Sequence, residues 1–112
     1  DSVSRQKRVS RKRREVRRAR LFERNFHSKE RVLFIKSLPC DVTGRVSSTV
    51  VNAHTKSRGA GGTYLDIVPL SAEVHQRFDE MPESKFEAMY QRTKQSIKER
   101  APSYQLLWEE RT

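Results

Sequence analysis

Apolar residues are sparse at the start of the chain and gather into short runs after residue 28. The segment RQKRVSRKRREVRRARLFERNF has few helix breakers and a faint apolar stripe, so its composition allows a helix. Further along, STVVNAHT and YLDIVPL are β-branched or apolar runs that predict two strands. The glycine-rich stretch KSRGAGGT lies between them and predicts an antiparallel hairpin.

Helical spacing of apolar residues returns on both sides of this hairpin. SKERVLFIKSLP predicts a short helix that begins after an N-cap at Ser28. SAEVHQRFDEM predicts a helix capped by Ser71, and KFEAMYQRTKQSIKER a continuous helix capped by Ser84. Pro102 begins a last short segment. The main elements are therefore expected in the order helix, strand, strand, helix, helix, an α+β fold with a strand–strand–helix core at about residues 49–81.

The charge is concentrated at the N-terminal end of the chain. Residues 1–36 hold fourteen Lys and Arg against four acids, which accounts for the whole net charge of +10. This asymmetry predicts a basic arm, helical or disordered, over residues 1–27, attached to a near-neutral domain at 28–112, with a polyanion as partner. A solubilising tail is the plain alternative. A membrane surface is disfavoured because the arm lacks an apolar face.

Composition narrows the class of protein further. No apolar run approaches the roughly 20 residues of a membrane span. Because no apolar stretch follows the basic N-terminus, we expect no signal peptide and a cytoplasmic location. Cys40 is the single cysteine, so an internal disulfide is excluded. Since residue 1 is aspartate, we expect a further N-terminal portion.

Four polar residues of the core segment are candidates for chemistry. His54 ends the first predicted strand, and Asp66 lies in the second. His75 and Asp79 are four residues apart on the following helix and so share one face. A hairpin packed against a helix could bring these four together around a metal, and imidazole, carboxylate and water ligands suit Mg²⁺, Mn²⁺, Ni²⁺ or Zn²⁺.

Three motifs then point to a family. LPCDVTG, AHTKSRGAGG and DIVPLSAEVHQRFDE follow one another in the chain, and the segment FEAMY comes after them. Together they resemble the HNH endonucleases found widely in bacteriophages, including the recombination-associated, Ref-like branch. The resemblance covers roughly residues 33–90 and implies a ββα-metal nuclease fold.

The resemblance also implies roles for the four candidate residues. His54 is the first-strand histidine, for which we favour general base, with metal ligand left open as the reverse assignment. Asp66 falls at the position that orients the base. His75 matches the helix histidine that binds the catalytic metal, and Asp79 stands where many relatives have another histidine and could also ligate the metal.

The implied activity is hydrolysis of DNA phosphodiester bonds in phage recombination or DNA processing. Mg²⁺ is the expected metal, with Mn²⁺ or Ni²⁺ as alternatives, and a recombinase or another DNA-processing protein is a possible partner. Lys56 and Arg58 are expected to contact phosphates of single- or double-stranded DNA. The cations of the arm would add affinity that falls with salt; they are Arg11, Lys12, Arg13, Arg14, Arg17 and Arg18.

The chain departs from the family at the cysteines. Many relatives hold a structural zinc with two cysteine pairs, but here Cys40 remains while Thr43, Ser71 and Val74 occupy the other positions. One thiolate cannot complete a tetrahedral zinc site, so no structural zinc is expected. The same loss favours an alternative function, a catalytically degenerate HNH-fold module that only binds nucleic acid.

Overall fold

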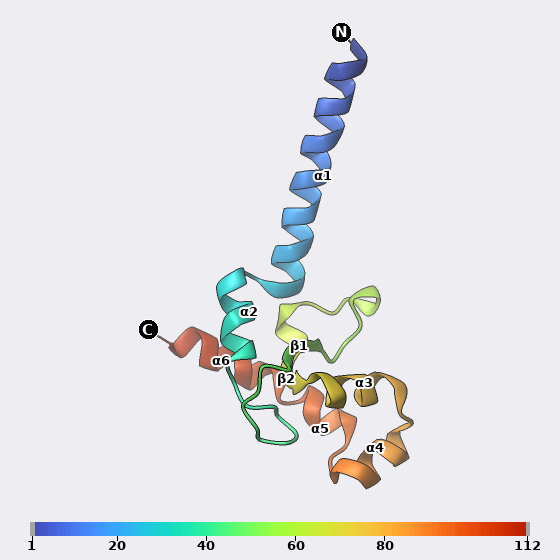
Figure 1. Cartoon of the computed structure of the whole chain (residues 1–112), viewed down its shortest axis with the longest axis vertical. Helices are drawn as coiled ribbons and strands as arrows, with labels where there is room; N and C mark the ends of the chain where they lie inside the picture. The colour runs from blue at the N-terminus through green and yellow to red at the C-terminus, as the bar shows by residue number, and fades with distance from the viewer. Residues whose placement is uncertain (1, 112) are drawn as a thin grey trace.

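Two antiparallel strands and six α-helices form an α+β fold in the part of the chain that this computed structural model describes, residues 2–111 (Figure 1). The helices are α1 (Ser2–Phe26), α2 (Lys29–Lys36), α3 (Ala72–Glu80), α4 (Glu83–Tyr90), α5 (Lys94–Lys98) and α6 (Ala101–Glu110). The strands are β1 (Val50–His54) and β2 (Ile67–Ser71), and their connection contains two 3₁₀ turns, η1 (Arg58–Ala60) and η2 (Tyr64–Asp66).

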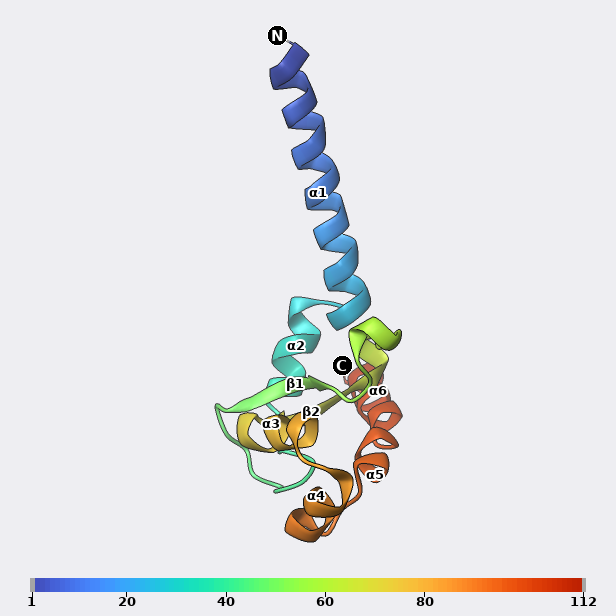
Figure 2. The same cartoon turned by 90° about the vertical axis from the view of Figure 1, so that its right-hand side faces the viewer.

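Helix α1 projects away from the rest of the molecule in both perpendicular views (Figures 1 and 2). Its 25 residues make a helix about 37 Å long. The longest dimension of the chain is 63 Å, and its radius of gyration is 17.5 Å. A compact domain of this length would have a radius of gyration of about 13 Å, so α1 accounts for the excess.

The hairpin has a defined register, with Ala53 opposite Val68 and His54 opposite Ile67. Side chains alternate along a strand, so Asn52 and His54 point to the same face of β1. That face meets α2 and the end of α1, because the Asn52 side-chain amide donates to the Val32 carbonyl at 3.1 Å. Helix α3 also packs against both strands (Figure 2).

The core forms where α2, the hairpin, α3, α4, α5 and α6 meet. Phe78 and Phe86 pack edge to face with their ring centroids 5.8 Å apart. All of β2 except its last residue is buried, which makes the hairpin the centre of the packing. The buried apolar residues are Ile35, Cys40, Val50, Ala53, Ile67, Val68, Leu70, Val74, Phe78, Phe86, Ile97, Ala101, Tyr104 and Trp108.

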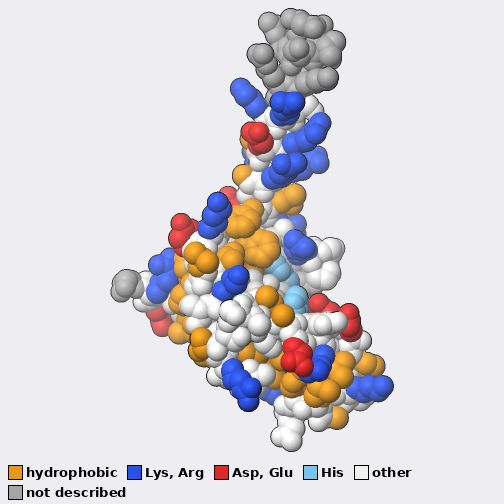
Figure 3. Space-filling view, viewed as in Figure 1, with side chains coloured by type: hydrophobic (Ala, Val, Ile, Leu, Met, Phe, Trp, Pro, Cys, Tyr) orange, Lys and Arg blue, Asp and Glu red, His pale blue; other side chains and the backbone are white. Residues whose placement is uncertain are grey.

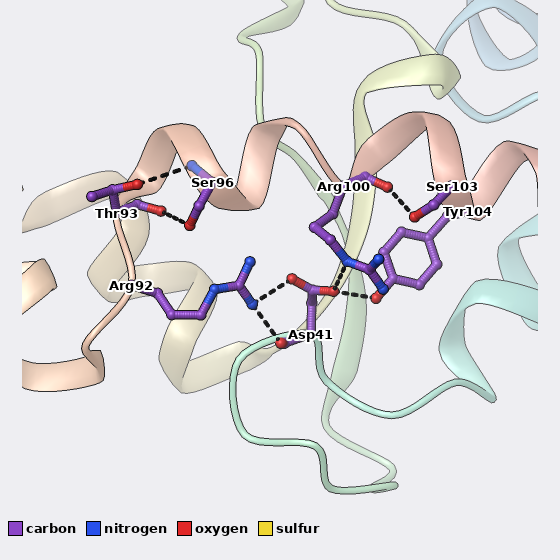
Figure 4. Close-up of polar contacts among 7 residues, drawn as sticks. All are labelled: Asp41, Arg92, Thr93, Ser96, Arg100, Ser103 and Tyr104. Carbon is purple, nitrogen blue, oxygen red and sulfur yellow. Dashed lines mark hydrogen bonds and ion pairs between the residues drawn. The ribbon is translucent and has the colours of Figure 1, made fainter.

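A buried carboxylate ties the turn before β1 to the C-terminal helices (Figure 4). The Asp41 side chain is 3% exposed and accepts from Arg92 Nη1 at 2.8 Å and from Arg100 Nε at 3.0 Å. The Tyr104 hydroxyl also donates to it. Burial alone would raise the pKa of Asp41, but these hydrogen bonds outweigh burial and hold the pKa below its ordinary value.

The second strand is shorter than the sequence predicts. It begins at Ile67, because residues 64–66 form η2 instead of extended chain. Thr63 caps this turn, and the Asp66 carboxylate accepts from the Thr63 backbone N–H at 2.9 Å. Asp66 therefore lies in a turn before the strand, and the prediction that placed it within the strand is wrong.

The helix predicted after residue 84 is two helices in the structure. Gln91 has a left-handed conformation, with φ of +57°, and ends α4. Ser84 lies inside α4, whose N-cap is Pro82, so the predicted cap at Ser84 is wrong. Thr93 caps α5 instead, accepting from the Ser96 N–H at 3.0 Å.

Other local predictions are confirmed. Ser28 caps α2 and accepts from the Arg31 N–H, and Ser71 caps α3 and accepts from the Val74 N–H. Val74, at a position where relatives of the resembled family have cysteine, is buried in the core. Within residues 2–111, no helix combines the length and apolar character needed to cross a membrane.

Candidate functional site

His54 lies where the end of β1 meets the last turn of α1. Its Nε2 is 2.7 Å from the Asn25 carbonyl oxygen. A carbonyl only accepts, so Nε2 must carry the proton and the Nδ1 lone pair is left for other use. The ring also packs edge to face on Phe26, with the centroids 5.1 Å apart. The carbonyl and the aromatic ring together fix the orientation of the imidazole.

The electrostatic setting of His54 favours the neutral ring. Burial lowers the pKa of His54, the Asn25 carbonyl opposes that effect, and the nearby charge of Arg58 lowers the pKa further. Asp66 raises the pKa, His75 lowers it, and the net result lies below the ordinary value of 6.5. At neutral pH the imidazole is therefore mostly unprotonated, which is the form a general base needs.

His75 and Asp79 form a pair on α3. His75 Nε2 is 3.2 Å from Asp79 Oδ2, as the four-residue spacing predicts. The side chains are 34% and 57% exposed, so solvent or a ligand can reach both. Figure 3 shows histidine side chains gathered below the base of α1, beside a group of acidic side chains.

The donor atoms of this pair fit a divalent metal as two of its ligands. They are an imidazole nitrogen and a carboxylate oxygen, both of which bind divalent metals. Mg²⁺ keeps several waters and substrate oxygens, so two protein ligands suffice for a weak site. Within residues 2–111, no group of three or more His, Cys, Asp or Glu side chains is arranged to hold a metal ion.

Asp66 acts on His54 only through its charge. Its carboxylate caps η2, and its backbone carbonyl accepts from the Thr55 N–H at 3.0 Å and the Thr55 hydroxyl at 2.7 Å. The His54 ring is held instead by the hydrogen bond that its Nε2 donates to the Asn25 carbonyl. Asp66 thus shapes the loop beside His54 and favours its protonated form electrostatically.

The loop between the strands is tightly built at one glycine. A Cβ on Gly62 would lie 2.0 Å from the Lys56 carbonyl oxygen, so only glycine fits there. The Gly62 N–H donates to the Ser57 carbonyl at 2.9 Å and closes the loop. Lys56 and Arg58 are exposed on this loop, and the influence of Arg58 on His54 places its charge near the site.

The basic residues of α1 from Arg11 to Arg24 are open to solvent. Residues 10–24 are exposed throughout, and the helix first becomes buried at Asn25. Leu21 and Phe22 are 45% and 37% exposed, whereas Asn25 is buried and Phe26 is half-buried against the core. The predicted phosphate contacts on α1 are free to bind a partner; they are Arg11, Lys12, Arg13, Arg14, Arg17 and Arg18.

Asn25 is the site residue that the sequence does not predict. It contributes a backbone carbonyl, which every residue has, and it is 29 positions from His54. Its buried side chain gives no sequence signal for this role. Comparisons of the chain with protein-family models, with curated proteins and with solved structures found no match.

Proposed function

We propose that this protein is a metal-dependent endonuclease of the HNH, or ββα-metal, type that hydrolyses DNA phosphodiester bonds during recombination or DNA processing. The observation that carries the proposal is the setting of His54, an oriented imidazole with a lowered pKa at the base of an exposed basic helix. The His75–Asp79 pair on the adjoining helix supports it. So do the motifs AHTKSRGAGG and DIVPLSAEVHQRFDE.

His54 is the general base of the proposed reaction. The Asn25 carbonyl holds the Nε2 proton, and Nδ1 takes a proton from the attacking water. The imidazolium that forms is stabilised by the same carbonyl, which lies at the negative end of α1. His75 and Asp79 hold the divalent metal, Mg²⁺ first and Mn²⁺ or Ni²⁺ as alternatives. A metal bound there supplies charge stabilisation for the phosphate and the leaving oxygen.

Plasmid nicking tests this proposal directly. The intact chain should nick supercoiled DNA with Mg²⁺, Mn²⁺ or Ni²⁺, and His54→Ala should lower the rate by about 10²–10⁴-fold. His75→Ala should require a higher metal concentration for half-maximal nicking, because one metal ligand is lost. His27→Asn is the matched control: His27 is exposed and has φ of +72°, which asparagine tolerates, so activity should be retained. Absence of nicking with all three metals, or equal activity of the two alanine variants and the native chain, refutes the enzyme.

A second function, a nucleic-acid-binding module without catalysis, is favoured by one specific observation. The cations of α1 between residues 10 and 24 are exposed and need no catalytic residue in order to bind phosphate. In this case the native chain binds DNA with strong salt dependence but leaves it intact with every metal. His54→Ala and His75→Ala then bind DNA as the native chain does.

A further inference from the structure

Four arginines of α1 share one groove. A shallow hollow of about 530 Å³ runs along the helix. It is lined by the four arginines and by three further residues: Lys12, Arg13, Val16, Arg17, Arg20, Leu21 and Arg24. Val16 and Leu21 flank the row of arginines and add apolar surface beside the arginine stems. The groove is open to solvent, since residues 10–24 are exposed.

Helical geometry explains why these arginines line up. Successive residues turn by about 100°, so positions 13, 17, 20 and 24 fall within a sector of about 60°. Arg11 and Arg18 fall on the opposite side, roughly 130–150° from the centre of this row. Arg11 and Arg18 thus lie away from the hollow, whereas the four arginines of the row line it. Figure 3 shows Lys and Arg side chains following the projecting helix towards the histidines.

The row has no counter-charge of its own. Among the described ion pairs, none involves Arg13, Arg17, Arg20 or Arg24. Two like-charged pairs four residues apart, Arg13 with Arg17 and Arg20 with Arg24, destabilise the helix by about 0.2–0.5 kcal/mol each. A polyanion lying in the groove removes this repulsion.

The row of arginines ends at the same end of α1 as the candidate site. Arg24, its last arginine, directly precedes Asn25, whose carbonyl accepts from His54. Eleven residues separate Arg13 from Arg24, a length of about 16 Å along the helix. One strand of a DNA duplex presents about five phosphates over that distance.

We propose that this groove binds the sugar–phosphate backbone of one nucleic-acid strand and directs that strand to His54. The guanidinium groups bind phosphate oxygens, and Val16 and Leu21 contact the apolar edges of the sugars. This proposal narrows the phosphate contacts predicted from the sequence: Arg13 and Arg17 belong to the row, whereas Arg11 and Arg18 lie on the back face of α1 and stay in solvent. The destination at His54 rests on the proposed function, whereas binding in the groove does not.

Two matched double variants of the full chain test the groove. Arg13→Gln/Arg20→Gln removes two cations of the row, and Arg11→Gln/Arg18→Gln removes two from the back face at the same seven-residue spacing. Glutamine has nearly the helix propensity of arginine, so α1 should persist, which circular dichroism verifies. Binding to a short duplex and to a single strand is measured by fluorescence anisotropy over a range of salt concentrations, with chelator present so that no DNA is cut.

The salt slope of binding decides the outcome. The row variant should lower the slope of log Kobs against log salt by about 1.8 for duplex or about 1.4 for a single strand, while the back-face variant leaves it nearly unchanged. Equal losses in both variants would mean a solvated basic arm without a binding face and would overturn the proposal. An unchanged slope in both would also overturn it, and would leave the groove to another occupant such as an acidic protein segment. Because no cleavage is measured, failure of the nuclease proposal leaves this result standing.

Discussion

Replacing Asp41 by asparagine should destabilise the fold more than any surface substitution. The Asp41 carboxylate is 3% exposed and receives two arginines and the Tyr104 hydroxyl (Figure 4). Asparagine keeps the shape of the side chain but removes its charge and one acceptor oxygen. Arg92 and Arg100 then lose the partner that joins the turn before β1 to the C-terminal helices.

The size of the effect follows from exposure. Removing one partner of a fully buried ion pair costs about 3–5 kcal/mol. Here Arg92 and Arg100 are 27% and 50% exposed, so water can solvate them after the change and the cost is smaller. We expect Asp41→Asn to lower the free energy of unfolding by about 2–3 kcal/mol, in line with the loss of one or two charged hydrogen bonds. For a domain of this size that is a fall in Tm of roughly 10–20 °C.

The pH dependence identifies the charge as the cause. The pKa of Asp41 is lowered in the folded state, so its contribution is present above the ordinary value of 3.8 and is lost as pH falls through the folded value. Urea unfolding at neutral pH should therefore separate native and variant chains, and the difference should shrink in acid below that value. Glu87→Gln, at an exposed position, is the control and should change stability by less than about 0.5 kcal/mol. A loss below about 1 kcal/mol, or a difference that persists unchanged in acid, would refute this reasoning.

Three further outcomes follow from packing and electrostatics. Gly62→Ala should lower the free energy of unfolding by about 1–3 kcal/mol in thermal melts, because its Cβ would overlap a backbone carbonyl. Gly59→Ala is the control and should be tolerated, since the nearest atom to its Cβ would be 3.6 Å away. Similar melting temperatures for the two variants would contradict the loop geometry. Phe86→Ala should lower the free energy of unfolding, measured by chemical denaturation, by about 3–5 kcal/mol. Met89 is exposed, so Met89→Ala should lower it by less than about 1 kcal/mol. Equal losses would mean that Phe86 is not part of the core. Since the pKa of His54 is lowered, the nicking rate should rise with pH through a midpoint below 6.5, and a midpoint above 6.5 would argue against His54 as the base.

Much of the secondary structure could be predicted from the local chemistry of the sequence. Ser28 and Ser71 cap their helices because a hydroxyl can satisfy a free N–H of the first turn wherever the helix lies. The β-branched run at Val50 forms a strand, and His75 meets Asp79 because residues four apart always share a helix face. The concentration of cations in the first third of the chain likewise needs no structure to be seen.

The tertiary structure decided which partners those residues meet. Asn25 lies 29 positions before His54, and Asp41 lies 63 positions before Tyr104. Neither contact can be predicted from the residues that neighbour these positions in the sequence. In the Asn25 contact the acceptor is a backbone carbonyl, identical in every residue type, so only the packing of α1 against the hairpin selects it. The sequence by itself thus determined helices, strands and charge, while their docking determined that the basic helix ends on His54.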